Sequence, residues 1–187
     1  MMNIHLKTKR LDIKRYTKED LEQVLPLFMD DNVLYYYLPN QVQIHSTDKL
    51  GMYLSDWDDG ETSFLFSCYK DMDLIAIFSL EQFSLENRHA ECGIALVKSK
   101  YYGKGYASEI INEFLLYLFE KIELNRIFMR YIAGNERSYH LFSKLGFKHE
   151  GCLRQHVKRN DKYLDMHFMG ILKTEFEEFN SHRKRDA

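Results

Sequence analysis

The sequence predicts a single α/β domain in which a mixed, mostly antiparallel sheet carries helices on both faces. From Glu61 the period changes to two, with Phe64, Phe66 and Cys68 alternating with smaller or polar neighbours, and a long helical stripe follows Val97. A strand–helix–strand unit after an antiparallel meander gives a sheet of mixed direction with helices packed on it. The 187 residues suit one domain, residues 1–187, and no linker, repeat or low-complexity tract divides them.

The composition argues against several functional classes. Lys and Arg total 26 and Asp and Glu total 28, so a net charge of −2 gives no support to nucleic-acid or membrane-surface binding. Cys68, Cys92 and Cys152 are widely spaced, so no disulfide framework and no zinc site are expected. His89 and Cys92 could suggest a metal pair, but they lack nearby partners. No apolar run approaches the ~20 residues of a membrane span, and a cytoplasmic location is expected.

The chain begins with a short strand and a capped helix. Leu11-Asp12-Ile13-Lys14 alternates apolar and polar residues, which is typical of a strand. Thr17 is the predicted N-cap of a capping box that ends at Asp20, and Pro26 should kink or shorten the helix that follows. The buried face of this helix is predicted to be Leu21, Val24, Leu25 and Phe28.

An irregular region is predicted between Asp30 and Gly60, with a second helix from Ser46 to Trp57. This region contains the aromatic run Tyr35-Tyr36-Tyr37-Leu38-Pro39, which has two interpretations. The run could form the wall of a substrate pocket, or it could belong to the core. The core interpretation is favoured because large aromatic side chains dominate core burial.

About seven strands are predicted in all. The middle strand of the meander is apolar on both faces, so we expect it to be central. After the meander, a persistent helical stripe is formed by Ala107, Ile110, Ile111, Phe114, Leu115, Leu118 and Ile122. A second helix is predicted from about Glu136 to Leu145, with Gly146 as its stop. The predicted strands after the first are Phe64–Cys68, Leu74–Leu80, Ala90–Val97, Arg126–Ile132, Phe147–Val157 and Tyr163–Leu172.

The stretch from Lys100 to Ala107 lies at a strand-to-helix junction and contains Gly103 and Gly105. The first N–H groups of a helix are unpaired, and the helix dipole makes this end attractive to a phosphate. The alternative is that the two glycines only allow a tight turn. A short glycine motif alone does not decide between these interpretations.

Three local motifs in this order resemble the GNAT superfamily of acetyl-CoA-dependent N-acetyltransferases. Gly103-Lys104-Gly105-Tyr106-Ala107 is similar to the family's pyrophosphate loop, although Lys100 stands where that motif has Gln or Arg. Asn135-Glu136-Arg137-Ser138 opens a helix after a strand, and Phe142-Ser143-Lys144-Leu145-Gly146-Phe147 looks like the family's Tyr-x-Lys-Leu-Gly-Phe ending. The run Arg10–Arg15 and the segment Asn125–Ile127 resemble the branch of ribosomal-protein N-terminal alanine and serine acetyltransferases.

The resemblance implies acetyl-CoA as the cosubstrate, with no metal. The loop N–H groups would bind the pyrophosphate, and the backbone of residues 96–98 would pair with the pantetheine arm. The resemblance also implies a bulge in this strand that splays it from the next one. Asn135 would hydrogen-bond the arm, cap its helix, or both. The implied cofactor-binding residues are Leu96, Val97, Lys98, Gly103, Lys104, Gly105, Tyr106, Ala107, Ser108, Asn135 and Phe142.

Catalysis would need a base to deprotonate the amine and a donor for the leaving thiolate. Glu91 is the first candidate base and Glu81 the second, and either could instead be an exposed edge carboxylate. Many family members use a Tyr as the acid where this chain has Phe142, which has no proton to give. Ser138, one helical turn earlier, could supply a proton or could be an ordinary first-turn serine.

The acceptor is expected to be a primary amine, and the branch suggests a protein N-terminus such as that of a ribosomal protein. Polyamines or other small amines are the enzymatic alternative, because Asp56, Asp58, Asp59 and Glu61 are clustered in the sequence. A non-catalytic acyl-CoA-binding module is the third hypothesis, supported by the missing Tyr at Phe142. The two final strands could form the edge of a homodimer.

Overall fold

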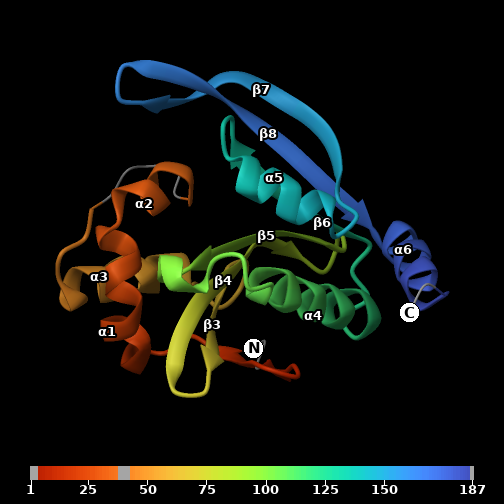
Figure 1. Cartoon of the computed structure of the whole chain (residues 1–187), viewed down its shortest axis with the longest axis horizontal. Coiled ribbons are helices and arrows are strands. Elements are labelled where there is room, and N and C mark those ends of the chain that lie inside the picture. Colours follow the sequence, from red (N-terminus) through yellow and green to blue (C-terminus); the bar gives the residue numbers. More distant parts are fainter. Residues whose placement is uncertain (1–3, 38–42, 186–187) are drawn as a thin grey trace.

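One mixed sheet of eight strands is the centre of the computed structural model, which describes residues 4–37 and 43–185 (Figure 1). The strand order is β1-β2-β3-β4-β5-β6-β8-β7. Among these neighbours β5 and β6 run parallel and the other pairs run antiparallel, which confirms the predicted class. The strands are His5–Lys7 (β1), Asp12–Arg15 (β2), Phe64–Lys70 (β3), Asp73–Ser84 (β4), His89–Leu96 (β5), Arg126–Ile132 (β6), Lys148–Arg159 (β7) and Lys162–Leu172 (β8).

The N-terminal helices differ in part from the prediction. Thr17 N–H donates to Asp20 Oδ2 at 2.9 Å, as a capping box requires, and the helix then tightens to a 3₁₀ form at Leu25–Met29, where Pro26 lies. An additional helix, α2, occupies part of the region predicted to be irregular, whereas α3 follows the prediction closely. Of the aromatic run, Leu38 and Pro39 lie outside the described residues. These elements are η1 (Lys18–Asp20), α1 (Leu21–Val24), η2 (Leu25–Met29), α2 (Asp31–Tyr37) and α3 (Thr47–Trp57).

The later helices are α4 (Tyr106–Glu120), α5 (Glu136–Ser143) and α6 (Lys173–Arg185), and a short 3₁₀ turn, η3 (Ser99–Tyr101), precedes α4. The predicted apolar stripe of α4 is buried from Ile110 to Leu118, whereas Ala107 is half-buried and Ile122 lies beyond the end of the helix. Helix α4 connects the parallel strands β5 and β6. Gly146, at φ 90°, follows α5 as predicted. Helix α6, in which Phe176 packs against Phe119, was not predicted.

Two large apolar clusters lie on opposite faces of the sheet. One joins the sheet to α4, α5 and α6, and includes Phe78, Phe114 and Phe142. The other joins the sheet to α1, α2 and α3, and includes Phe28 and Leu54. Helices therefore cover both faces (Figure 1). Among the described residues, the helices are all too short or too polar to span a membrane.

Strands β5 and β6 separate after a short shared stretch. They pair only from His89 to Glu91 with Arg126 to Phe128, while β5 continues to pair with β4 as far as Leu96. The bulge that the resemblance implied in β5 is not there, because the β4–β5 register is continuous from Glu91 to Leu96. The register shift lies in β4 between Glu81 and Ser84, where two residues of β4 oppose one of β5. The expected splay is present, but the bulge is on the neighbouring strand.

Candidate functional site

A cavity of about 1070 Å³ lies where β5 and β6 separate. Its walls are residues of β4, β5 and β6, the loop before α4, the first turn of α4, and α5. Residues of α2 and α3 close the other end. One continuous space therefore connects the glycine loop to the two candidate carboxylates, and it is large enough for a ligand with an extended arm.

The glycine loop forms the first end of the cavity. Gly103 and Gly105 have φ of 71° and 79°, a conformation that residues with a side chain rarely adopt. The helical hydrogen bonds of α4 start with Glu109 N–H, which donates to the Gly105 carbonyl at 3.1 Å. The N–H groups of Tyr106, Ala107 and Ser108 precede that bond, so the helix leaves them unpaired. These donors and the positive end of the helix dipole suit a phosphate.

Arg10 braces this loop from the start of the chain. Its guanidinium donates to the Lys104 carbonyl at 3.2 Å and to Glu109 Oε2 at 2.7 Å, and it stacks over the Tyr106 ring at 4.5 Å. Lys104 itself is exposed and does not border the cavity. The Lys100 ammonium lies 3.6 Å from Asp73 and also does not border the cavity. Arg10 therefore holds the loop in place, and the sequence did not suggest this role.

The free edge of β5 forms one side wall. Val97 N–H donates to the Ile75 carbonyl of β4 at 2.9 Å, so this donor is already used. Along β5 the backbone N–H and C=O groups of successive residues point alternately toward β4 and away from it. Since the Val97 N–H points toward β4, the backbone groups of Leu96 and Ile94 point to the other side, into the gap between β5 and β6. Leu96 and Ile94 border the cavity, whereas Val97 is buried and Lys98 is exposed away from it. Of the predicted segment 96–98, Leu96 is thus the residue placed to meet a pantetheine arm.

Helix α5 forms the opposite wall. Asn135 caps it by accepting the Ser138 N–H at 3.2 Å, and both residues border the cavity. Phe142 also borders it, and its ring is 2% exposed and packs edge-on against Phe147. Arg137 borders the cavity too and stacks over the Tyr102 ring at 5.0 Å. Its cationic group could meet an anionic ligand, a role that the sequence reasoning did not assign.

Glu91 of β5 borders the cavity, and hydrogen bonds fix the position of its carboxylate. It is 6% exposed, and its two carboxylate oxygens accept from Arg130 Nε at 2.7 Å and from Gln82 Nε2 at 2.9 Å. Glu91 lies directly opposite Glu81 across β4 and β5, and two like charges in that arrangement repel each other. Arg130 offsets this repulsion at Glu91. Neither Arg130 nor Gln82 was identified from the sequence.

The pKa of the Glu81 carboxyl is raised above its ordinary value. Burial raises its pKa, and the negative charge of Glu91 raises it further, against the opposing hydrogen bond from Ser79. Burial and the charge of Glu81 likewise raise the pKa of the Tyr53 hydroxyl. A half-buried carboxylate with a raised pKa that borders a cavity is suited to accept a proton.

Aromatic residues surround the second end of the cavity. Tyr36 of α2 and Tyr53 and Trp57 of α3 line it together with the exposed carboxylate of Asp56. The favoured assignment of the aromatic run to the core is therefore wrong for Tyr36, which is 36% exposed and faces the cavity. Aromatic faces and a carboxylate together favour a cationic amine.

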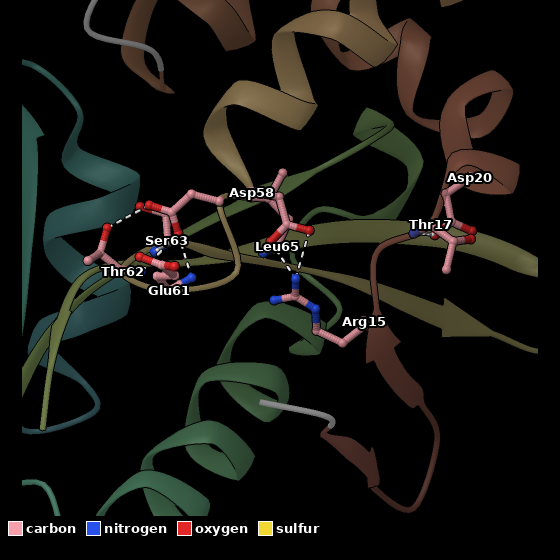
Figure 2. A network of polar contacts seen from close by, with 9 residues as sticks. Arg15, Thr17, Asp20, Asp58, Glu61, Thr62, Ser63 and Leu65 are labelled. Carbon is pink, nitrogen blue, oxygen red and sulfur yellow. Dashed lines mark hydrogen bonds and ion pairs between the residues drawn. The ribbon is translucent and has the colours of Figure 1, made fainter. Parts of the chain in front are cut away.

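The acidic cluster after α3 has mainly structural contacts (Figure 2). Asp58 accepts from Arg15 Nη2 at 2.6 Å and from the Leu65 N–H at 3.1 Å, which ties α3 to β2 and β3. Asp59 accepts the N–H groups of residues 61, 62 and 63, each at 2.8 Å. Of the four acidic residues that suggested a polyamine site, only Asp56 lines the cavity, and Glu61 is exposed outside it.

A helix start that suits a phosphate, an open strand edge and a carboxylate with a raised pKa all border one cavity. An acyltransferase that takes its acyl group from a nucleotide-linked thioester needs such parts. The chain belongs to the GNAT acetyltransferases, since the model of the family described as "Acetyltransferase (GNAT) domain" matches residues 13–168. The protein is an N-acetyltransferase of this family.

Two relatives and one solved structure are similar to this chain. The putative ribosomal N-acetyltransferase YdaF of Bacillus subtilis is 33% identical over 107 residues, which cover 57% of this chain and 58% of that protein. The spermidine N(1)-acetyltransferase of Vibrio cholerae is 31% identical over 104 residues, covering 56% and 60%. The crystal structure of spermidine N-acetyltransferase from Vibrio cholerae in complex with CoA and spermine has a TM-score of 0.81 at 24% identity, covering 91% of this chain and 99% of that one, and it confirms the fold.

Proposed function

We propose that the protein transfers the acetyl group of acetyl-CoA to a primary amine by direct attack, and that the amine is a protein N-terminus. The observation that carries the proposal is the single cavity that runs from the glycine loop to Glu81 through the gap between β5 and β6. The pyrophosphate would bind the N–H groups of Tyr106, Ala107 and Ser108. The pantetheine arm would pair with the β5 edge at Leu96 and Ile94.

The proton acceptor in this proposal is Glu81, so the order of the two candidates from the sequence is reversed. Both oxygens of Glu91 are already engaged, by Arg130 and Gln82, whereas the raised pKa of Glu81 favours taking a proton. Glu81 takes a proton from the ammonium, directly or through a water molecule. The neutral nitrogen then attacks the thioester carbonyl and the C–N bond forms. The C–S bond breaks, and the second proton that the nitrogen gives up passes through water to the departing thiolate, which leaves as the thiol of coenzyme A.

Ser138 is the proposed hydrogen-bond donor to the departing thiolate. It borders the cavity one helical turn before Phe142, and Phe142 has no proton to donate. A thiolate is a much weaker base than an alkoxide, so the Ser138 hydroxyl would stabilise the departing thiolate by a hydrogen bond and keep its own proton. The acyl-CoA-binding module remains the competing explanation for Phe142, and it predicts binding without turnover.

The assignment of the acceptor to a protein N-terminus rests on YdaF and on the structural contacts of the acidic cluster. A polyamine would require several carboxylates around the cavity, and Asp58 and Asp59 are engaged in contacts with the backbone and with Arg15. A polyamine is the second candidate, favoured by Asp56 and the aromatic ring faces at the second end of the cavity and by the spermidine acetyltransferase relative.

The test measures free thiol release from acetyl-CoA with N-terminal Ser and Ala peptides, spermidine and spermine. We expect turnover with the peptides and a decrease in kcat/KM of about 10²- to 10⁴-fold for Glu81→Gln. Faster turnover with spermidine would replace the peptide assignment by the polyamine one. Binding of acetyl-CoA without thiol release from any amine would overturn the proposed activity in favour of the binding module. Glu86→Gln, in the exposed loop between β4 and β5, is the matched control.

A further inference from the structure

A group of metal-binding side chains lies on the β7–β8 hairpin, outside the cavity. A ligand atom from each of Cys152, Asp165 and His167 lies within 4.8 Å of the other two. None of the three borders the cavity. We propose that these residues bind a divalent ion of the zinc class, with a sulfur, a carboxylate oxygen and an imidazole nitrogen as ligands.

The strand register explains why these residues meet. Asp165 and His167 are two residues apart on β8, so their side chains lie on one face of the sheet. Cys152 of β7 lies directly opposite His167 and therefore shares that face. A register shift between His149 and Gly151 inserts one additional residue in β7. Without this residue, the side chains of His149 and Cys152 would point to opposite faces of the sheet. With it, His149 lies on the same face as the three ligands and beside His167.

Neighbouring residues fix the positions of Asp165 and His167 through contacts that could remain when an ion binds. Asp165 Oδ1 accepts the Gln155 N–H at 2.8 Å, which leaves its second oxygen for an ion. The His167 ring stacks on Tyr131, with centroids 5.0 Å apart and planes 18° apart. His149 Nε2 lies 3.1 Å from His167 Nδ1. Such a partner fixes the orientation of a ligating imidazole, and its loss usually weakens metal binding.

The donor set selects the kind of ion. Magnesium and calcium take oxygen ligands almost exclusively, whereas a thiolate together with an imidazole favours zinc and similar transition metals. Three protein ligands leave a fourth position for water, because zinc is most often tetrahedral. A bound ion would connect β7 to β8 beside Tyr131, which borders the cavity.

The experiment titrates the reduced, chelator-treated full-length protein with Co²⁺, which reports a thiolate ligand by a near-ultraviolet charge-transfer absorption. We expect one Co²⁺ per chain, displacement by Zn²⁺, and loss of the absorption in Cys152→Ser. Asp165→Asn and His167→Gln should lower the affinity by at least about 100-fold, and His149→Gln by about 10- to 100-fold, as for an orienting partner.

His156→Gln is the matched control, because His156 is an exposed histidine of the same strand that does not belong to the cluster. It should bind Co²⁺ like the unchanged protein. The proposal is overturned if saturating Co²⁺ produces no thiolate absorption, if the absorption persists in Cys152→Ser, or if His156→Gln abolishes it as His167→Gln does. Unchanged circular dichroism in every variant would exclude unfolding as the cause of a loss.

Discussion

Glu81 and Glu91 face each other across two strands, and their coupling makes a directional prediction about pH. The charge of Glu91 raises the pKa of Glu81, after the larger effect of burial. Glu91→Gln removes this charge and leaves Arg130 unpaired, and both changes favour the ionised form of Glu81. The pKa of Glu81 should fall, so the acidic limb of kcat/KM against pH should move to lower pH.

Arg130→Met should shift the pKa of Glu81 in the opposite direction from Glu91→Gln. The positive charge of Arg130 lowers the pKa of Glu81, so its removal should raise that pKa and move the acidic limb to higher pH. The two profiles, measured with saturating acetyl-CoA and limiting amine, should bracket that of the unchanged protein. Shifts of both variants in the same direction would show that Glu81 is not the group that titrates.

Ser138 provides a second prediction for a single side chain. Ser138→Ala should lower kcat by about 10- to 100-fold, because it removes the proposed hydrogen bond to the charged thiolate. The KM for acetyl-CoA should change little, since Asn135 and the glycine loop remain. If kcat is the same in Ser138→Ala and in the unchanged protein, Ser138 has no role in thiolate departure and is an ordinary residue of the first helical turn. Ser143→Ala, later in α5, is the control.

The sequence could identify these groups but not rank them. Glu81, Glu91 and Ser138 all border the cavity that the motifs implied. The ranking depends on Arg130, which is 39 residues from Glu91 and contacts it only after β5 and β6 pair. An ion pair of this kind has no local pattern in the sequence. For the same reason, the resemblance could not indicate that Val97 N–H is already bonded to Ile75.

Arg10 connects the edge of the sheet to the start of α4, and this contact is testable. Arg10→Ala removes the donor to Lys104 and leaves the Glu109 carboxylate uncompensated near the site proposed for the pyrophosphate. The KM for acetyl-CoA should rise about tenfold, equivalent to about 1.4 kcal/mol, with little change in the KM for the amine.

Two further variants isolate the cause. The double variant Arg10→Ala/Glu109→Gln should recover part of the increase in the KM for acetyl-CoA. It removes the Glu109 charge that would repel the pyrophosphate, although the contact of Arg10 with Lys104 is still missing. Lys9→Ala, which changes the exposed neighbour, should behave like the unchanged protein. An equal rise in both KM values for Arg10→Ala would indicate general destabilisation instead of a local effect on the loop.

The end of the β7–β8 hairpin lies beside α2 and is hydrogen-bonded to it (Figure 1). Arg159 is 3% exposed, and its Nε donates to the Tyr35 carbonyl of α2 at 2.9 Å. Arg159→Ala should therefore raise the KM for the amine more than that for acetyl-CoA, because Tyr36 of the same helix lines the second end of the cavity. Lys158→Ala is the exposed control; equal effects of the two variants on the amine KM would contradict the role.

Elements with long periodic patterns were predictable, and elements stabilised mainly by distant contacts were not. The stripe of α4 and the meander β3–β5 show their periods within the sequence. Strand β1 has three residues, too few to show a period, and it depends on pairing with β2. Helix α2 depends on Arg159, more than 100 residues away, and α6 packs on α4 through Phe176.

At the scale of the whole molecule, the sheet is divided by the gap that forms the cavity. Strands β1 to β5 form one part of the sheet and strands β6 to β8 the other. The two parts are joined by the parallel pairing of β5 with β6, which covers three residue pairs. The proposed position of acetyl-CoA contacts the loop and β5 on one side and α5 on the other, so the cosubstrate would join the two halves. Binding to the folded state at about 100 times Kd adds about 2.7 kcal/mol, which should raise Tm by about 5 to 10 °C.

Hydrogen exchange would show where this stabilisation arises. With acetyl-CoA bound, amides of the first turn of α4, of β5 from residue 92 to residue 96, and of the first turn of α5 should all exchange more slowly. Protection of all three segments is the result expected of a ligand that bridges the gap. Protection of the α4 turn alone would mean that only the glycine loop holds the cosubstrate and that the α5 wall, with Asn135 and Ser138, is not part of the site.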